Sequence, residues 1–333
     1  MYTLKEHPED FVVKERMTLD LKKEGSFAYF KLTKKGMATY ETMELLSKFL
    51  IVPLKKIGFA GAKDKEAVTE QFISVPAVYQ KRLLTFEHPK IKLEFVGYGN
   101  EPIAVGTLEG NDFTIVVRNI EKGPKPISWM INYFDEQRFS TKNVEVGRAI
   151  IKEDFKKACS LIEENRVKDH LVDNPTDFVG ALTRVPLKLL SMYVHAYQSY
   201  LFNEVAAQYV KLKTKEVVEL PYSTGVFVFP KKKIENMVIP IVGFGAEFEK
   251  NEIYDLYQKL MEQEQVTTRN FIFKKIPHLS AEGSQRDLIA LVENFTFRVE
   301  DDEKHRGMKK CTTSFSLPKG AYATIAIRMM FLE

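Results

Sequence analysis

The stretch KLEFVGYGNEPIAVGTLEGNDFTIVVRNI, residues 92–120, carries the clearest strand pattern in the chain. Near its end, the apolar residues Phe113, Ile115 and Val117 occupy alternate positions. Side chains at alternate positions of a strand point to the same face, so these three residues predict a strand with one buried face. The residues between them would line the opposite face. We therefore expect a β-sheet built around this stretch.

Further strand patterns lie on both sides of this stretch, toward the two ends of the chain. Before it, strands are predicted in FVVKERM (11–17), FAYFKLTKK (27–35), KKIGF (55–59) and EQFISVP (70–76). After it, strands are predicted in NFTFRVE (294–300), CTTSFSLP (311–318) and YATIAIRMMFL (322–332). Among the N-terminal strands, YETMELLSKFL (40–50) predicts a helix that Thr39 caps and Pro53 stops.

The middle of the chain has helical spacing. One helix is expected to begin near Trp129, and a better-defined one covers residues 145–165. Further on, an apolar residue recurs every fourth position along a helix of roughly five turns. This stripe, which we interpret as core packing, consists of Tyr193, Tyr197, Leu201, Val205 and Tyr209. Strands at both ends and helices between them indicate an α+β fold, in which a sheet domain is completed by its own C-terminus and a second domain is inserted.

Composition excludes several classes of protein. The 333 residues contain no apolar run of about 18 residues, so no membrane span is expected. The charged N-terminus lacks a signal peptide core, and Cys159 and Cys311 are far apart, so we expect a cytoplasmic protein without a disulfide framework. The six histidines form no HxxxH or HExxH pattern, which argues against a metal site.

The net charge of +4 is too small to indicate a nucleic-acid partner by itself. Basic residues cluster locally, and we interpret each cluster as a solvated face or hairpin tip. The acidic run Glu300–Glu303 is interpreted as a solvated loop. The clusters are Lys14 with Arg16, Lys34 with Lys35, Lys231–Lys233, and Lys304 with Arg306, Lys309 and Lys310.

One acid stands out in GFAGAKDKEAVTEQF, residues 58–72, where Asp64 lies between Lys63 and Lys65 just after a glycine-rich turn. A solvated aspartate is an anion at neutral pH, and nearby cations favour its charged form. Such a group suits nucleophilic attack, or stabilisation of a cationic centre such as a sugar C1′ that is losing its base. An ordinary surface loop is the alternative interpretation.

A second candidate is INYFDEQRF, residues 131–139. The amide of Asn132 could bind the edge of a nucleobase, the ring of Phe134 could stack on it, and Arg138 could hold a phosphate. The alternative is simple packing of Tyr133 and Phe139 with Arg138 on the surface.

These stretches belong to a set of motifs that resembles the TruD family of pseudouridine synthases along nearly the whole chain. The motifs fall in the family's order, and those containing KD-x-x-A-x-T-x-Q and NYF-x-x-QRF are the most specific. They are HPEDFVVKE (7–15), GFAGAKDKEAVTEQ (58–71), GTLEGNDFTIVVR (106–118), NYFDEQRF (132–139), AYQSYLFN (196–203) and FSLPKGAYATIAIR (315–328).

The resemblance implies a role for individual residues. Asp64 matches the catalytic aspartate, and Lys63 matches the lysine before it. Positions that contact the target nucleoside match Phe11, Asn132, Phe134 and Tyr322, the last standing where many relatives have phenylalanine. Arg138, Gln198, Asn203 and Arg328 lie in motif positions and are expected to be supporting residues. Arg138 or Arg328 could pair with Asp64 and orient it.

The resemblance also implies a fold and a domain arrangement. The fold is a mixed, largely antiparallel sheet flanked by helices, with an inserted helix-rich TRUD domain. We expect the catalytic domain in residues 1–150 and 297–333 and the inserted domain in residues 151–296. Asp135 and Ser140 replace glycines that are usual in the family, so the geometry of this loop or the approach of RNA could differ.

The implied activity is isomerisation of uridine to pseudouridine in tRNA, at a uridine of the D-stem region that is flipped out of its stack. The reaction exchanges no electrons, so no cofactor or metal is expected. RNA is the expected partner, no obligate protein partner is implied, and the protein is expected to be a monomer. Two alternatives remain: an inactive tRNA-binding protein that acts as a folding chaperone, and an N-glycosidase that releases the base.

Overall fold

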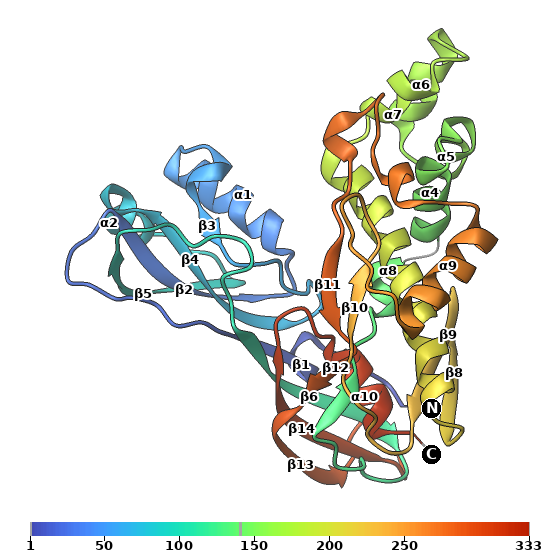
Figure 1. The fold of residues 1–333 in the computed structure, drawn as a ribbon. Coiled ribbons are helices and arrows are strands. Elements are labelled where there is room, and N and C mark those ends of the chain that lie inside the picture. Colours follow the sequence, from blue (N-terminus) through green and yellow to red (C-terminus); the bar gives the residue numbers. More distant parts are fainter. Residues whose placement is uncertain (1, 140–141, 333) are drawn as a thin grey trace. The chain divides into compact units, whose positions relative to one another are not determined.

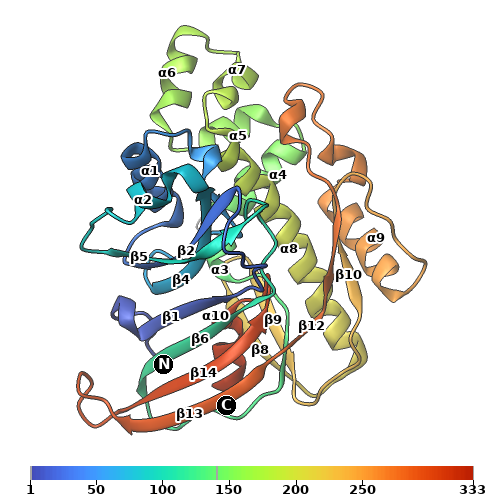
Figure 2. The same ribbon diagram turned by 90° about the vertical axis from the view of Figure 1, so that its left-hand side faces the viewer.

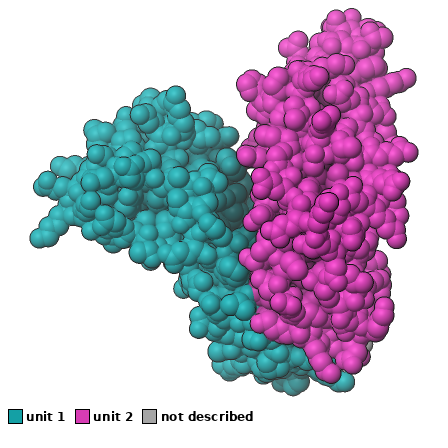
Figure 3. All heavy atoms as spheres, viewed as in Figure 1, with its two compact units in different colours: residues 1–128, 291–331, 333 teal, residues 129–290, 332 magenta. Residues whose placement is uncertain are grey.

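The computed structural model describes residues 2–139 and 142–332. The chain forms two compact units (Figures 1 and 3): unit 1 comprises residues 1–128 and 291–331, and unit 2 comprises residues 129–290. Unit 1 is thus completed by a C-terminal segment, and unit 2 is inserted between its parts. Residues 129–150, which we expected in the catalytic domain, lie in unit 2. The functional assignment of the two domains stays a prediction.

Unit 1 is a sheet with helices. Its elements are β1 (Phe11–Arg16), β2 (Phe27–Lys35), α1 (Thr39–Leu50), β3 (Gly58–Phe59), β4 (Val68–Pro76), α2 (Gln80–Leu83), β5 (Ile91–Gly99), β6 (Gly110–Ile120), β13 (Glu293–Asp301), β14 (Lys309–Pro318) and α10 (Ala323–Met330). Short 3-10 turns lie at Pro8–Asp10, Leu54–Lys56 and Ala77–Tyr79. The strands predicted for residues 11–120, 294–300 and 311–318 are confirmed, except that the one expected over residues 55–59 is reduced to Gly58–Phe59.

The strands of unit 1 form one sheet of eight strands in the order β13-β14-β6-β1-β4-β2-β5, with β3 paired to β4. Figure 2 shows β13, β14, β6 and β1 side by side. The β1–β4 pair is parallel, with Val12 opposite Val68, and the other pairs are antiparallel. The predicted mixed, largely antiparallel sheet is therefore confirmed. Two distant segments, β6 and β14, become neighbours in it.

Helix α1 covers one part of this sheet. Its buried residues Met43, Leu46 and Leu50 recur at helical spacing and belong to the same core cluster as Phe30 of β2 and Ile73 of β4. The helix begins at Thr39 with Ala38 as its N-cap residue, one position before the expected cap. It ends at Leu50, because Ile51 adopts the left-handed conformation with φ of 58°.

The last predicted strand, residues 322–332, is wrong. The segment forms α10 after β14 ends at Pro318 and the chain turns at Gly320, whose φ is 80°. Alternating Ile325 and Ile327 imitate a strand. The helix is buried on nearly every side, so an alternating pattern alone does not separate it from a strand. Its buried residues are Ala323, Ile325, Ala326, Ile327, Met329 and Met330.

Unit 2 is rich in helices. Its elements are β7 (Trp129–Ile131), α3 (Glu136–Phe139), α4 (Asn143–Ile151), α5 (Phe155–Leu161), α6 (Asn165–Asp173), α7 (Phe178–Thr183), α8 (Leu187–Lys213), β8 (Val217–Tyr222), β9 (Gly225–Pro230), β10 (Val238–Ile241), α9 (Glu252–Glu264), β11 (Ser284–Asp287) and β12 (Ile289–Leu291). Short 3-10 turns lie at Thr268–Phe271 and Pro277–Leu279. The strands pair as β7 with β12, β8 with β9, and β10 with β11.

Helix α8 is the central element of unit 2. The predicted apolar stripe lies on it, and all of its members except the half-buried Tyr193 are buried. The stripe does not define one face, because polar Gln198, Ser199 and Asn203 are buried as well. A helix buried on nearly every side is typical of the centre of a domain.

Two helix predictions in unit 2 need correction. Trp129 begins the strand β7 rather than a helix. The single helix expected over residues 145–165 is interrupted between α4 and α5. Glu153 has a φ of 54°, and the Asp154 side chain accepts a hydrogen bond from Lys157 N at 3.0 Å, which caps a new helix.

Within the described ranges, no helix is long and apolar enough to cross a lipid bilayer. Both cysteines are buried free thiols, and burial raises the pKa of each to about 11. No group of three His, Cys, Asp or Glu side chains that could hold a metal ion occurs among residues 2–139 and 142–332.

Candidate active site

Asp64 lies in unit 1, in the loop that joins β3 to β4 (the Asp64 loop, residues 60–67). Its Oδ2 accepts a hydrogen bond from Lys5 Nζ at 3.0 Å in an ion pair. The Lys5 side chain is 10% exposed, whereas the Asp64 side chain is 33% exposed. The carboxylate is thus held by a cation and open to solvent. The sequence suggests Arg138 or Arg328 as the partner, whereas the structure shows Lys5 beside this carboxylate.

The backbone of the Asp64 loop is tied to neighbouring elements. Lys63 N donates to Thr39 Oγ1 at 2.8 Å, which links the loop to the start of α1. Gln71 Nε2 on β4 donates to Gly61 O at 3.2 Å, and Thr39 Oγ1 lies 3.2 Å from Gln71 Oε1. Thr39 and Gln71 are both buried. Gln71, the glutamine of the motif, therefore fixes the position of the Asp64 loop.

Lys34 on β2 provides another link to this loop. Its Nζ donates to Asp64 O at 2.7 Å and to Met37 O at 2.6 Å. Its side chain is fully buried, so the interpretation of Lys34 with Lys35 as a solvated cluster is wrong for Lys34. Burial lowers the pKa of Lys34 to about 8, against the opposing attraction of Asp64.

Lys63 points away from solvent. Its Nζ lies 2.6 Å from Glu15 Oε2 on β1, and the two side chains are 6% and 0% exposed. Glu15 Oε1 also accepts a hydrogen bond from Phe72 N at 3.2 Å. The pair therefore joins the Asp64 loop to β1 and β4. Contact between Lys63 and a substrate stays a prediction.

Phe11, expected to contact the target nucleoside, is 2% exposed. Its ring meets Phe113 edge to face at a centroid distance of 6.3 Å, and the Lys5 ammonium lies 4.4 Å from its centroid. A cation held near an aromatic ring is attracted by the ring's quadrupole. Phe11 therefore supports Lys5, which in turn holds Asp64.

The preceding residue, Asp10, belongs to a buried ion cluster. Arg118 at the end of β6 donates from Nε and Nη2 to Asp10 at 3.0 and 2.9 Å, and from Nη1 to Asp302 at 3.1 Å. Arg118, Asp10 and Asp302 are each less than a tenth exposed. The interpretation of Glu300–Glu303 as a solvated loop is therefore wrong: residues 300 and 301 end β13, and Asp302 is buried.

The remaining candidates of unit 1 lie on α10. Tyr322 is its N-cap residue, and Arg328 lies in its last turn; both are half-buried. Their contact with a nucleoside, or support of the site, stays a prediction.

Unit 2 holds the other candidates, beginning with Asn132 just after β7. Asn132 is 7% exposed and donates from Nδ2 to Asp287 O at 3.0 Å. Arg286 on β11 donates from Nη2 to Asn132 Oδ1 at 2.6 Å and from Nε to Asn132 O at 2.8 Å. The side-chain amide is thus oriented by one backbone carbonyl, of Asp287, and by the guanidinium of Arg286, which also binds the main-chain carbonyl of Asn132.

Phe134 is fixed by Asn203 of α8. Asn203 Oδ1 accepts from Phe134 N at 2.9 Å, and Asn203 Nδ2 donates to Phe134 O at 2.8 Å. The guanidinium carbon of Arg286 lies 4.2 Å from the centroid of the Phe134 ring, and that of Arg138 lies 5.9 Å away. A buried amide paired with both backbone groups of one residue explains why Asn203 occupies a helix interior.

Gln198 has a comparable structural function one turn earlier on α8. Its Nε2 donates to Val242 O at 2.7 Å and to Glu282 O at 3.2 Å, and its side chain is 4% exposed.

Arg138 is half-buried, and Asp135 is 3% exposed with its carbonyl accepting from Arg138 N at 2.9 Å. Ser140 lies outside the described residues.

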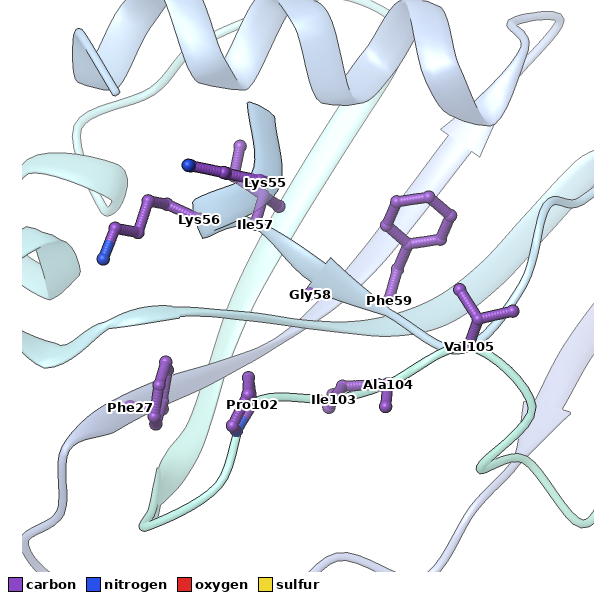
Figure 4. Close-up of a pocket in the computed structure, with 10 residues that line it drawn as sticks. All are labelled: Phe27, Lys55, Lys56, Ile57, Gly58, Phe59, Pro102, Ile103, Ala104 and Val105. Atoms are coloured by element: carbon purple, nitrogen blue, oxygen red, sulfur yellow. The ribbon is translucent and has the colours of Figure 1, made fainter. Parts of the chain in front are cut away.

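Unit 1 also has a pocket of about 440 Å³ beside β3, and Asp64 does not line it. Lys55 and Lys56 lie toward one side, and Phe59 and Val105 toward the other (Figure 4). The other lining residues are Phe27, Ile57, Gly58, Pro102, Ile103 and Ala104.

The sequence did not single out Lys5, Glu15 or Arg286, although Glu15 lies within the first motif. Each acts through a partner far along the chain: Lys5 through Asp64, Glu15 through Lys63, and Arg286 through Asn132. A charged residue inside a motif was the available signal for Glu15. Nothing in the local pattern around Arg286 points to Asn132.

A crystal structure described as the putative tRNA pseudouridine synthase D from Methanosarcina mazei has a TM-score of 0.69 and 25% identity, covering 98% of this chain and 92% of that one. Among curated proteins, tRNA pseudouridine synthase D of Aquifex aeolicus is 28% identical over 98% of this chain and 97% of its own length. Probable tRNA pseudouridine synthase D 2 of Methanocaldococcus jannaschii is 29% identical over 99% and 91%.

The matched proteins define a class, the pseudouridine synthases, which are isomerases. The model of the family tRNA pseudouridine synthase D (TruD) matches residues 2–162 and 159–330. The chain belongs to the TruD family.

Proposed function

We propose that this protein isomerises uridine to pseudouridine in tRNA, at a uridine of the D-stem region, with Asp64 as the catalytic carboxylate. The observation that carries the proposal is the Asp64 site itself. A carboxylate that is one-third exposed lies 3.0 Å from a nearly buried lysine, on a loop clamped by Thr39 and Gln71. A group held in place before the substrate arrives need not be ordered during the reaction.

The reaction must break the N1–C1′ bond of uridine, rotate the base, and form the C5–C1′ bond. Overall, C5 loses a proton and N1 gains one, so atoms and charge balance without an oxidant or a second substrate. Asp64 would act on the sugar or base as a nucleophile, or remove a ribose proton. Both routes use the carboxylate that Lys5 holds at 3.0 Å.

A uridine must leave its stack to reach a carboxylate, which costs a few kcal/mol. Stacking on an aromatic ring contributes about 1–3 kcal/mol per base and offsets part of that cost. We assign the stacking to Phe134 and the recognition of the base edge to Asn132, with Tyr322 contributing to substrate binding. Phe11 and Lys63 are buried and contribute to substrate binding indirectly, Phe11 beside Lys5 and Lys63 through its ion pair with Glu15. Arg286 lies over the Phe134 ring, so a base that stacks on that face must displace it.

We further propose that Arg138, Gln198, Asn203 and Arg328 support the site rather than contact the base. The contacts of Gln198 and Asn203 with backbone groups favour this role. We expect tRNA to be the partner, the protein to act as a monomer, and its location to be the cytoplasm.

The test is incubation of the purified protein with an unmodified tRNA transcript, followed by carbodiimide-dependent primer extension. The wild type should produce one strong stop in the D-stem region, and Asp64→Asn should produce none while still binding the transcript. Lys65→Gln, a neighbouring charge change in the same loop, serves as the control and should retain the stop. Binding without a stop by the wild type would favour the chaperone alternative, and free uracil would favour the N-glycosidase.

A further inference from the structure

We propose that Lys34 is a positioning residue for Asp64, whose buried ammonium fixes the backbone of the Asp64 loop. The inference rests on the proposed function for its kinetic consequence. Its structural part, that Lys34 holds this loop in place, can be measured independently of activity.

The geometry joins three segments at one ammonium group. Lys34 lies near the end of β2, and its Nζ donates to Met37 O at 2.6 Å and to Asp64 O at 2.7 Å. Gly36, with a φ of 61°, makes the turn between β2 and α1 that brings the Met37 carbonyl back toward this side chain. The acid is therefore held through its main chain by Lys34 and through its side chain by Lys5.

The complete burial of Lys34 indicates that its ammonium group has a structural function. Burying an ammonium group away from solvent costs free energy. Hydrogen bonds that the charged group donates to carbonyl oxygens offset part of that cost. Without Lys34, two carbonyl groups would lose their donor, and a buried carbonyl rarely lacks one. An apolar residue would fill the space on β2 but leave the Asp64 carbonyl without its partner. The arrangement is therefore suited to fixing the position of Asp64.

The charges around Lys34 determine how this support depends on pH. Asp64 in the loop and Glu41 on α1 favour the protonated form, whereas Lys63 disfavours it. Burial is the largest influence and lowers the pKa to about 8. As pH rises through this value the ammonium loses its charge, so its hydrogen bonds to the two carbonyls weaken. Support of the Asp64 loop should then decrease.

The experiment compares Lys34→Met with Lys35→Met. The exposed side chain of Lys35, the next residue on β2, pairs with Glu9 and makes no contact with Asp64. At neutral pH, Lys34→Met should lower kcat on tRNA at least about tenfold, because small displacements of a catalytic group cost about this much or more. KM should stay within about twofold, since the change alters positioning rather than binding. Lys35→Met should retain the wild-type kcat.

The pH profile distinguishes positioning from general destabilisation. Wild type and Lys35→Met should lose kcat as pH rises through about 8, the pKa of Lys34. Lys34→Met should lack this decrease, because the group that titrates is gone. A wild-type kcat together with a wild-type alkaline decrease in Lys34→Met would overturn the proposal.

Hydrogen–deuterium exchange provides the second measurement, which does not depend on activity. Amides of residues 61–67 should exchange at least about tenfold faster in Lys34→Met than in Lys35→Met, because their opening becomes easier. Equal exchange would overturn the proposal even if the wild type made no pseudouridine, whereas inactivity of the wild type alone would contradict only the proposed function. If Lys34→Met fails to fold, Lys34→Gln, which retains two donors without the charge, takes its place.

Discussion

Asn203 shows how a single side chain can set the position of another. It pairs with both backbone groups of Phe134 and is 1% exposed. We predict that Asn203→Ala lowers the free energy of unfolding by about 2–4 kcal/mol, because two buried backbone groups lose their partners. Urea unfolding followed by circular dichroism measures it. Gln208→Ala, a half-buried amide on the same helix, is the control and should change stability by less than about 0.5 kcal/mol.

Retained stability in Asn203→Ala would show that water or a neighbouring group replaces the amide. The same variant should also reduce pseudouridine formation, since Phe134 would no longer be held.

Individual residues could be predicted where their motif carried the signal, and not where a distant partner decided their role. The glycine turn and flanking lysines single out Asp64, whose catalytic role stays a prediction. Lys5 is 59 positions away, and only folding brings it to the carboxylate. Lys34 was misinterpreted because a lysine beside another lysine at a strand end is usually solvated. Its burial depends on a turn at Gly36 that returns a carbonyl to its ammonium.

Among the elements, the contact between α4 and α8 depends on a glycine. A Cβ atom on Gly147 would lie 2.1 Å from Tyr193 O, which is too close for any real contact. Alanine normally stabilises a helix relative to glycine by about 1 kcal/mol, whereas overpacking costs about 1–3 kcal/mol or more. We therefore predict that Gly147→Ala destabilises unit 2 by about 2 kcal/mol. A rise in the thermal midpoint would contradict the close packing of these helices.

The ion cluster around Arg118 joins the N-terminal turn to the β13–β14 hairpin. Removal of the guanidinium leaves Asp10 and Asp302 buried without their cation. We predict that Arg118→Met lowers the free energy of unfolding by about 3–5 kcal/mol, as expected for a broken buried ion pair. Arg298→Met, at an exposed ion pair on β13, is the control and should cost less than about 1 kcal/mol.

The same cluster predicts a dependence of stability on pH. Burial tends to raise the pKa of Asp302, but hydrogen bonds from the backbone of Asn119 and Lys304 and from Arg118 hold it below its ordinary value. Hydrogen bonds from Lys310 first, and then from its own backbone and Arg118, lower the pKa of Glu303 to about 2. The stabilisation is therefore present above about pH 4 and lost as pH falls toward about 2. The decrease in the free energy of unfolding between about pH 4 and pH 2 should be shallower in Arg118→Met than in the wild type. An equal decrease in both proteins would show that other carboxylates cause it.

Most strands could be predicted because alternation is a local property, as in Phe113, Ile115 and Val117 on β6. The two wrong predictions arise where a local pattern fits more than one structure. Residues 323–330 alternate well enough to imitate a strand, and their helical burial becomes visible only once they lie against other elements. The break at Glu153 and Asp154 was missed because helical periodicity continues on both sides of it.

For the molecule as a whole, the order of elements along the chain predicted a sheet completed by its own C-terminus. β14 pairs with β6, as a discontinuous sheet unit requires. The boundary was harder to predict, because residues 143–151 read as a helix that could join either unit. The close packing of Gly147 on the backbone of Tyr193 places α4 against α8, in unit 2. No sequence pattern predicts that two helices pack this closely.

The central claim is that Asp64 carries out an isomerisation in which C5 of uridine loses its hydrogen. The most direct measurement is release of tritium from tRNA labelled at C5 of uridine, with wild type and Asp64→Asn compared in single turnover and free uracil measured in the same samples. The account predicts release by the wild type without free uracil, and a decrease of at least about a thousandfold in Asp64→Asn, which corresponds to about 4 kcal/mol of lost barrier lowering. Release by Asp64→Asn at the wild-type rate, or free uracil from the wild type, would contradict it.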